Sequence, residues 1–485
     1  MTARRSFPAG LRLPPSKSGP MQRPLRVIAP PLHAVVSMDQ GNGRGAEPIV
    51  AAGDRVRIGT TIGRATGDAA VDVHSPIAGV VRSLALRPIP GPAASGLCVL
   101  IDADGSGESE CGSVQLEWQT MPADQLLARI RGAGIAGLGG AAFPTHAKIA
   151  AARTQSATHV VLNGAECEPW ICCDDALMRE RADDVVLGAQ VILQACGATQ
   201  CTIAVEDDKP EAIAAIERAL ALATDARISL RSLPAVYPAG AERQLLAAVT
   251  GREIPTGALP PSVGLLCQNV GTAAAVGRLV RTGLPLTRRI VTVTGSGVSE
   301  PANVEACIGT PIAELVAACG GYGPKPLRLI AGGSMTGRAL ASDDVPLTQG
   351  VNCVLVATAA DLRQRGSEMP CIRCGDCATV CPAGLLPQSL LRAVAANYEH
   401  GLDRYGLADC IECGCCDYVC PSQIPLTARF VAARHAQSLR LDQQRRASDA
   451  RERFAQHQLR LAEAAEAERR AFEDARRRAR GEVTD

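Results

Sequence analysis

Eight of the 20 cysteines in this 485-residue chain fall into two copies of one spaced pattern, and no other feature constrains the fold as strongly. The first copy reads CIRCGDCATVCP, at 371–382, and the second reads CIECGCCDYVCP, at 410–421. Both copies have the form C-x2-C-x2-C-x3-C-P. Three thiolates at this spacing lie on one tight loop that can hold three corners of an iron–sulfur cube, so the fourth corner needs a cysteine from elsewhere.

The pattern predicts two 4Fe-4S clusters that exchange their fourth ligands. We expect one cluster to be held by Cys371, Cys374, Cys377 and Cys420, and the other by Cys410, Cys413, Cys416 and Cys381. Zinc is one alternative, but structural zinc usually takes two well-separated C-x2-C pairs, a layout that neither copy has. Disulfides are the other alternative. They form in secreted proteins, and we expect no secretory signal in this chain. Cys415 lies out of register and is assigned no role.

The composition argues against nucleic acid as a partner. Fifty basic and 49 acidic side chains give a net charge of +1, and aromatic residues make up 2% of the chain. Such a chain has neither long-range attraction to a polyanion nor many base-stacking side chains. Its length allows about three domains or more, and its free cysteines indicate a reducing cytosol.

One stretch, 185–205, has no charged residue and is long enough to cross a bilayer. Glutamines interrupt it, and Gly197 indicates the end of a helix that is followed by a short strand. We therefore expect two separate elements and no direct membrane span. Any association with a membrane would be peripheral, through a protein partner.

The N-terminal part of the chain predicts an arm followed by a β module. Residues 1–30 are rich in Pro, Arg and Ser without a period, which indicates an irregular arm. Residues 31–108 contain short β-branched segments broken at glycines and resemble the biotinyl/lipoyl-type half-barrel. Carrier domains of that type present a lysine at the hairpin between their halves, but 65–75 contain none. A structural module is therefore favoured over a swinging arm.

From 115 to 284 the sequence predicts an α/β domain. Strands are expected at 158–164, 201–207 and 228–236, and helices at 183–197, 209–223 and 240–251. This alternation is typical of a Rossmann-like, mostly parallel sheet covered by helices. Such sheets bind ligands at the carboxyl ends of their strands.

A glycine-rich loop at 131–148 stands at the entrance of this domain. It contains a G-x-G-x-x-G match, but 124–131 predicts a helix before it, whereas a dinucleotide fingerprint follows a strand. Closely spaced glycines let backbone N–H groups approach a phosphate, and Lys148 adds a positive charge. The alternative is a mobile surface loop.

Four segments resemble, in the same order, motifs of the NADH-oxidising flavoprotein subunit of respiratory complex I. They are GLGGAAFPTHAK at 137–148, NGAECEP at 163–169, YPAGAE at 237–242 and QNVGT at 268–272. The resemblance implies FMN in this pocket with NADH stacked on it. It places the flavin against Gly137, Gly139, Gly140, Lys148, Asn163, Tyr237, Gly240 and Asn269. It places the nicotinamide side against Glu166, Glu168 and Glu242.

The later segments resemble further modules. Residues 286–358 are similar to a β-grasp module of the SLBB type, for which we expect a spacing and docking role without catalytic residues. Residues 362–430 are similar to a two-cluster ferredoxin domain. The order of modules over about 20–430 resembles that of the C subunit of the Rnf/Rsx electron transport complex. Ala165, Ala241 and Gln268, which differ from the complex I motifs, agree with that subunit's own versions.

This resemblance implies a multidomain α/β protein that is a peripheral subunit on the cytoplasmic side of the cell inner membrane. It implies an NADH-dependent oxidoreductase whose complex couples electron transfer between NAD(H) and ferredoxin-type carriers to ion translocation. Hydride exchange at FMN would precede one-electron transfer through the two clusters. The implied partners are integral membrane subunits and ferredoxin-type subunits.

Two other functions stay open. The chain could be an electron wire and docking scaffold without flavin, or a soluble diaphorase subunit of a hydrogenase or formate dehydrogenase. The tail at 431–485 is rich in Ala, Arg and Glu, with Glu466 and Arg470 four residues apart. This pattern predicts a charged, exposed helix with too few apolar residues for a core. It would be a solvated helix or a docking helix for a partner.

Overall fold

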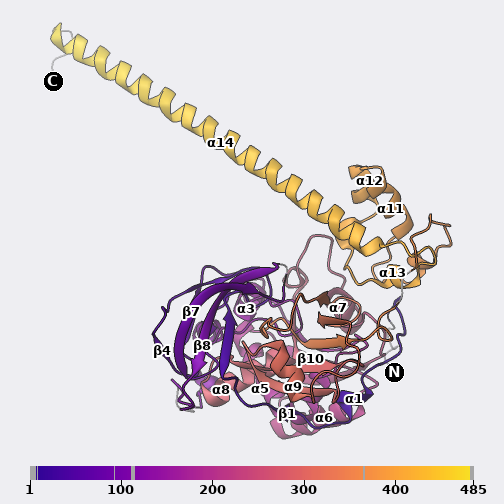
Figure 1. Cartoon of the computed structure of the whole chain (residues 1–485). Helices are drawn as coiled ribbons and strands as arrows, with labels where there is room; N and C mark the ends of the chain where they lie inside the picture. Colours follow the sequence, from indigo (N-terminus) through magenta and orange to yellow (C-terminus); the bar gives the residue numbers. More distant parts are fainter. Residues whose placement is uncertain (1–6, 8, 92, 111–114, 364–365, 481–485) are drawn as a thin grey trace. The chain divides into compact units, whose positions relative to one another are not determined.

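The computed structural model describes residues 7, 9–91, 93–110, 115–363 and 366–480 (Figure 1). The chain divides into two compact units, one made of Met1–Gln388 with Asp409–Ile424 and the other of Ser389–Ala408 with Pro425–Asp485. The ends of the predicted arm and tail, at 1–6 and 481–485, lie outside the described residues. Both cysteine runs belong to the first unit.

Two antiparallel sheets form the β module near the N-terminus. One has the order β2 (His33–Ser37), β8 (Ser95–Ala103), β7 (Gly79–Pro88), β4 (Arg55–Val56). The other has the order β3 (Ala46–Pro48), β5 (Thr61–Ala65), β6 (Val73–His74). Val36 and Val99 from the first sheet and Ile62 from the second share one buried core. The two sheets thus pack on each other as the predicted half-barrel requires.

A four-stranded parallel sheet forms the centre of the first unit. Its order is β11 (Ile228–Leu233), β10 (Gln200–Glu206), β9 (His159–Gly164), β12 (Leu265–Asn269). Side chains alternate across it, so that Val160 and Leu162 enter one core with α5 (Ala182–Cys196) while Val161 enters another with α7 (Glu242–Thr250). Burial on both faces confirms the predicted sheet covered by helices.

The helices and short turns of this region connect the strands. They are η1 (Trp118–Thr120), α2 (Ala123–Gly132), α3 (Thr145–Thr154), α4 (Cys173–Glu180), α5 (Ala182–Cys196), α6 (Pro210–Ala223), α7 (Glu242–Thr250), η2 (Pro260–Val263) and α8 (Val270–Thr282). Helices α5 and α8 approach each other very closely. A Cβ on Gly188 would lie 1.7 Å from the Ala273 carbonyl oxygen, and one on Gly277 would lie 2.2 Å from that of Asp184. Glycine is therefore required at both crossing points.

The uncharged stretch at 185–205 lies in two elements, as predicted. Helix α5 ends at Gly197, whose φ of 78° is left-handed, and β10 follows. No helix among the described residues has both the length and the apolar character needed to cross a membrane.

A second sheet of six strands is mixed. Its order is β1 (Arg26–Val27), β14 (Ala302–Cys307), β13 (Arg288–Thr294), β17 (Cys353–Ala357), β15 (Arg328–Ala331), β16 (Arg338–Ala339). Its core includes Val304 and Val354 together with Leu315 of α9 (Ile312–Ala318). Strands β15 and β16 form an antiparallel hairpin.

The N-terminal arm is more ordered than its composition predicts. It contains α1 (Ser18–Met21), and β1 pairs in parallel with β14. The amide of Leu11 donates to the Tyr237 carbonyl at 2.7 Å, and buried Lys17 binds the Glu166 carbonyl. The prediction of an irregular arm therefore holds for most of its described residues and fails at α1 and β1.

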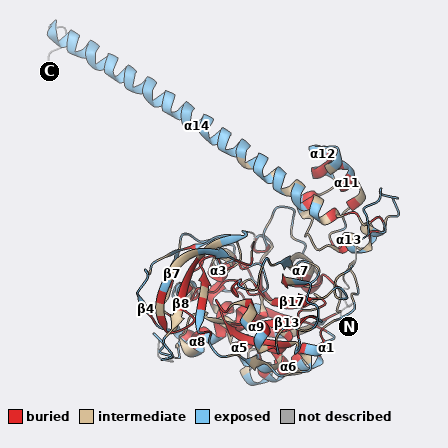
Figure 2. Ribbon diagram, in the orientation of Figure 1, coloured by how far each residue is buried: buried red, intermediate tan, exposed pale blue. Residues whose placement is uncertain are grey.

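The cysteine runs carry α10 (Asp376–Thr379) and α13 (Cys415–Val419), which pack on each other. Between the two runs in the sequence lie α11 (Pro387–Ala395), α12 (Glu399–Arg404) and η3 (Leu407–Asp409). Helix α14 (Leu426–Ala479) buries only Leu426 and Phe430, and Figure 2 shows it exposed along most of its length. Within the second unit, Arg440 of α14 pairs with Glu399 at 3.0 Å. The predicted C-terminal helix is confirmed.

The buried imidazole of His74 gives stability a pH dependence. Burial lowers the pKa of His74 from 6.5 to about 4. Between these values the unfolded chain binds a proton that the folded chain does not, so stability falls as the pH falls from 6.5 to 4. The full effect is about 3 kcal/mol. We predict that the melting temperature of a His74→Gln variant drops less between pH 7.5 and pH 5 than that of the wild type. Exposed His457→Gln is the control, and equal drops in all three proteins would contradict this.

The exposure of α14 predicts that most of it can be removed. A chain without residues 441–485 keeps the anchor pair of Arg440 and Glu399 and loses no buried side chain among the described residues. Its melting temperature should lie within about 2 °C of the full-length value, because surface changes usually alter stability by about 0.5 kcal/mol or less. Differential scanning calorimetry and iron content measure this. Loss of iron or aggregation would mean that the distal helix supports the fold.

Candidate functional site

A cavity of about 420 Å³ lies where the parallel strands end. Asn163, near the carboxyl end of β9, and Asn269, the last residue of β12, both line it. Parallel α/β sheets place ligands at this edge, and the volume is in the range of small-molecule sites. Other walls come from the six-stranded sheet and from the second cysteine run.

Most residues that the sequence assigned to flavin and nicotinamide meet at this cavity. Those on its lining are Gly139, Gly140, Asn163, Glu166, Glu168, Tyr237, Gly240 and Asn269. Gly137, Lys148 and Glu242 are not among the lining residues. The four motifs, which are far apart in sequence, therefore converge on one place.

The glycine-rich loop is held in a fixed conformation. The amide of Gly137 donates to the Phe143 carbonyl at 2.8 Å, and that of Leu138 donates to Thr272 Oγ1 at 2.9 Å. Gly140 has a φ of 106°, and a Cβ there would meet no other atom within 4 Å. The loop thus offers bare, ordered backbone at the cavity, as a closely approaching ligand requires.

Two asparagines tie the motifs together. The Asn163 amide donates to the Gly240 carbonyl at 2.8 Å. The Asn269 amide donates to Asp174 Oδ2 at 2.6 Å, while its oxygen accepts from the Gly271 amide at 2.8 Å and caps α8. Both side chains are therefore held in place by bonds that cross between motifs.

Lys148 and Glu242 bind each other instead of the cavity. The Lys148 ammonium contacts the Glu242 carboxylate and donates to the Cys267 carbonyl at 3.0 Å. Burial disfavours the charge, but Glu242 and Cys267 together outweigh it, so the pKa of Lys148 is raised. Helices α3 and α7 both pack against β12, which brings the two side chains together. Their assignments to phosphate and nicotinamide stay predictions.

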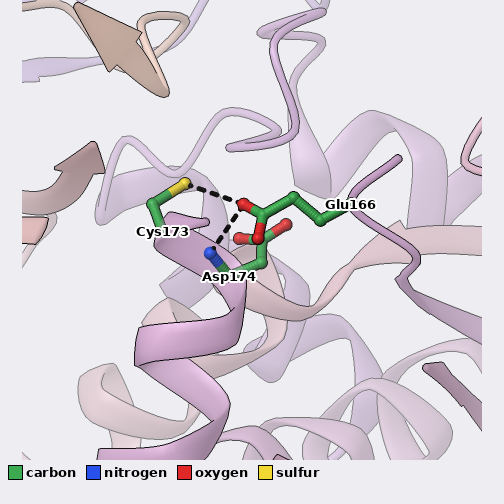
Figure 3. Close-up of side chains that lie close together, drawn as sticks. All are labelled: Glu166, Cys173 and Asp174. Carbon is green, nitrogen blue, oxygen red and sulfur yellow. Dashed lines mark hydrogen bonds between the residues drawn. The ribbon is translucent and has the colours of Figure 1, made fainter. Parts of the chain in front are cut away.

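Glu166, Cys173 and Asp174 form a compact group beside the cavity (Figure 3). Glu166 Oε1 accepts from the Asp174 amide at 2.9 Å and from Cys173 Sγ at 3.4 Å, and so caps α4. Burial raises the pKa of Glu166 to about 7, and the Asp174 carboxylate adds to the shift. The ligand atoms lie within 4.8 Å of one another, close enough for a metal, but the bonds drawn in Figure 3 are those of a helix cap.

Glu168 fixes the hairpin of β15 and β16. Its carboxylate accepts from the Thr336 amide at 3.0 Å, from Thr336 Oγ1 at 2.8 Å and from the Met335 amide at 3.2 Å. This hairpin supplies cavity residues that the sequence did not indicate, namely Gly332, Gly333, Thr336, Gly337 and Arg338. The glycine-rich run at 332–337 was the available signal, but nothing in it indicated a partner more than 160 residues away.

The two cysteine runs have the same backbone conformation. The residue before the second cysteine is left-handed in both, with φ values of 61° at Arg373 and 58° at Glu412. The residue after it is a left-handed glycine, Gly375 or Gly414, and a short helix follows. This shared wrap fits three thiolates of each run around one cluster.

Cys381 lies close to the other run. Burial raises the pKa of Cys381, and Cys413 of the second run raises it further. Cys413 also lines the cavity, and the Tyr237 hydroxyl donates to its carbonyl at 2.7 Å. Buried Cys415 is out of register and forms a hydrogen bond with Cys413. The cavity and the second run therefore share a wall.

Models of known families match four successive parts of the chain. They are the RnfC Barrel sandwich hybrid domain at 5–106, the Nuo51 FMN-binding domain at 130–278, the SLBB domain at 290–339 and the 4Fe-4S dicluster domain at 370–424. The glycine cradle and the paired cysteine loops fit FMN and two iron–sulfur clusters, which these models describe.

Curated relatives cover nearly the whole chain. The C subunit of an ion-translocating oxidoreductase complex from Pseudomonas aeruginosa is 42% identical over 98% of this chain and 61% of its own length. The equivalent subunit from Haemophilus influenzae strain PittEE is 38% identical over 94% of this chain and 70% of its own length. The chain belongs to this RnfC family. It spans roughly 55 to 70% of the length of most of these relatives.

Solved structures show more distant likeness. The crystal structure of an NAD+-reducing NiFe-hydrogenase in the air-oxidized state is 20% identical and covers 60% of each chain with a TM-score of 0.44. The family membership therefore depends on the sequence relatives and the family models.

The position of Cys381 predicts cross-ligation. Cys381→Ala should remove the fourth ligand of the cluster nucleated by Cys410, Cys413 and Cys416, and iron should fall from about eight to about four atoms per chain. EPR of the reduced protein, with Cys410→Ala as reference, should show the same signal lost in both variants. Cys415→Ser is the matched control and should keep both clusters. If Cys381→Ala instead loses the signal that Cys377→Ala loses, the ligand exchange is wrong.

Proposed function

We propose that the chain is a peripheral electron-transfer subunit of a membrane-bound complex that couples electron transfer between NAD(H) and ferredoxin-type carriers to ion translocation. One observation carries the proposal. The cavity that gathers the flavin motifs is also lined by Cys413, a predicted cluster ligand. A two-electron site and a one-electron carrier that share a wall can exchange electrons without a further protein.

The chemistry divides between the two kinds of cofactor. FMN held in this cavity would supply hydride exchange with a nicotinamide and the release of single electrons to 4Fe-4S clusters. The protein binds these cofactors and orients them. Gly139 and Gly140 expose backbone at the cavity. Asn163 ties the end of β9 to Gly240, and Asn269 ties the end of β12 to Asp174 of α4. Tyr237 holds the Cys413 loop at the cavity wall through its hydroxyl.

Two acidic residues of the cavity are assigned to the nicotinamide end of NAD(H). Glu166 and Glu168 both line it, and burial raises the pKa of each carboxyl group. Burial thus disfavours the charged form of both carboxyl groups, which lessens the repulsion of an anionic dinucleotide. We assign these two residues to the nicotinamide side, and the flavin to Gly139, Gly140, Asn163, Tyr237, Gly240 and Asn269.

The remaining assignments follow the family. The relatives are named as subunits of ion-translocating oxidoreductase complexes, which supports integral membrane and ferredoxin-type subunits as partners. We place the chain on the cytoplasmic side of the inner membrane, in peripheral association. We propose domain limits of 31–108, 115–284, 286–358 and 362–430.

Anaerobic purification tests the proposal. We predict one FMN and about eight iron atoms per chain, and bleaching of flavin and cluster absorbance by NADH. Iron without flavin would favour the wire and scaffold function. Flavin and iron in a chain that never co-purifies with membrane subunits from its native host would favour a soluble diaphorase. Tyr237→Phe, which loses only the hydroxyl bond to Cys413, should keep both cofactors and alter the EPR signal of the cluster at 410–416.

A further inference from the structure

The hairpin of β15 and β16 is rigidly placed at the cavity. Glu168 binds two amides and one hydroxyl of its loop, which spans 332–337. A Cβ on Gly333 would lie 2.3 Å from Glu168 Oε2, and one on Gly337 would lie 2.2 Å from the Gly333 carbonyl oxygen. The loop is thus folded tightly on itself and on Glu168. The residue that follows the loop therefore has a defined position.

Arg338 follows the loop directly and lines the cavity. It is exposed, and its Nη1 donates to the Gly91 carbonyl at 3.0 Å. That partner is neutral, and Arg338 takes part in none of the ion pairs among the described residues. A guanidinium has five N–H donors, so most of its capacity is left for a ligand.

Two other cationic side chains of this region already have binding partners. Lys148 binds Glu242, and Lys17 binds the Glu166 carbonyl. The other acidic or basic side chains on the described lining are the carboxyl groups of Glu166, Glu168 and Asp174. Arg338 is therefore the cationic side chain that this lining offers to an anionic ligand.

We propose that Arg338 binds a nucleotide phosphate in this cavity and that the hairpin loop 332–337 forms a second wall of the nucleotide site. The inference rests on the proposed function, in which FMN and NAD(H) are the ligands, and both carry phosphate. Guanidinium groups bind phosphate oxygens with two parallel hydrogen bonds, which fix orientation as well as affinity. The six-stranded sheet then takes part in ligand binding, beyond the spacing role expected from the sequence.

Direct binding measurements on the full chain test this. FMN affinity is measured by quenching of flavin fluorescence on flavin-depleted protein, and NAD+ affinity by calorimetry on FMN-loaded protein under anaerobic conditions. Arg338→Gln should weaken one of the two affinities about tenfold. Arg338→Lys keeps the charge without the forked geometry, and should weaken it about threefold. Arg328→Gln, in the exposed β15 position of the same hairpin and off the lining, is the matched control.

The two arms distinguish the source of the phosphate. A selective loss of FMN affinity assigns Arg338 to the flavin phosphate, and a selective loss of NAD+ affinity assigns it to the dinucleotide pyrophosphate. If Arg338→Gln and Arg338→Lys match Arg328→Gln in both affinities, the inference is overturned and Arg338 only braces the turn at Gly91. Melting temperatures and iron content separate a folding defect from a binding defect. Should the wild type bind neither nucleotide, the proposed function fails together with this inference.

Discussion

The side chain of Asn269 connects more parts of the functional site than any other single group described above. It donates to the Asn163 carbonyl at 3.3 Å and to Asp174 Oδ2 at 2.6 Å, and accepts from the amides of Gly271 and Thr272. It thereby joins β12, β9, α4 and α8. Each partner left unsatisfied inside the protein would cost about 1 to 3 kcal/mol, so the geometry of this corner depends on one amide.

Close backbone contact is the second condition on which the site depends. Helices α5 and α8 touch where Gly188 meets Ala273, and this contact fixes the first turn of α8, which follows β12 directly, against α5. At the cavity, a Cβ on Gly240 would lie 2.5 Å from the Ala165 carbonyl oxygen. Glycines in the helices that support the site and glycines at the cavity therefore have the same role. They bring backbone segments together at distances that other residues would prevent.

Local patterns were predictable from the sequence, whereas long-range pairings were not. The cysteine spacing and the strand and helix periods are local, and both cysteine loops and β9, α5, β10 and α6 lie where those patterns placed them. The binding of Lys148 to Glu242 depends on how α3 and α7 cross β12, which no spacing encodes. The hairpin carrying Arg338 reaches the cavity through Glu168, a contact across 167 residues or more. Strand β1 has two residues and pairs with β14 through its backbone, so the composition of the arm did not indicate a strand there.

In the proposed function, the contact between Tyr237 and Cys413 links ligand binding in the cavity to the reduction potential of the neighbouring cluster. Cluster potentials depend on solvent exposure and hydrogen bonding around the thiolates. Cys413 lies on the cavity lining, and the Tyr237 hydroxyl donates to its backbone carbonyl. In that function, a ligand that displaces water from the cavity would change the potential of the cluster that Cys413 is predicted to hold. By linkage, reduction of that cluster would change the affinity for the ligand by the same free energy. The wall shared by the cavity and the Cys413 loop would then couple ligand binding to cluster reduction.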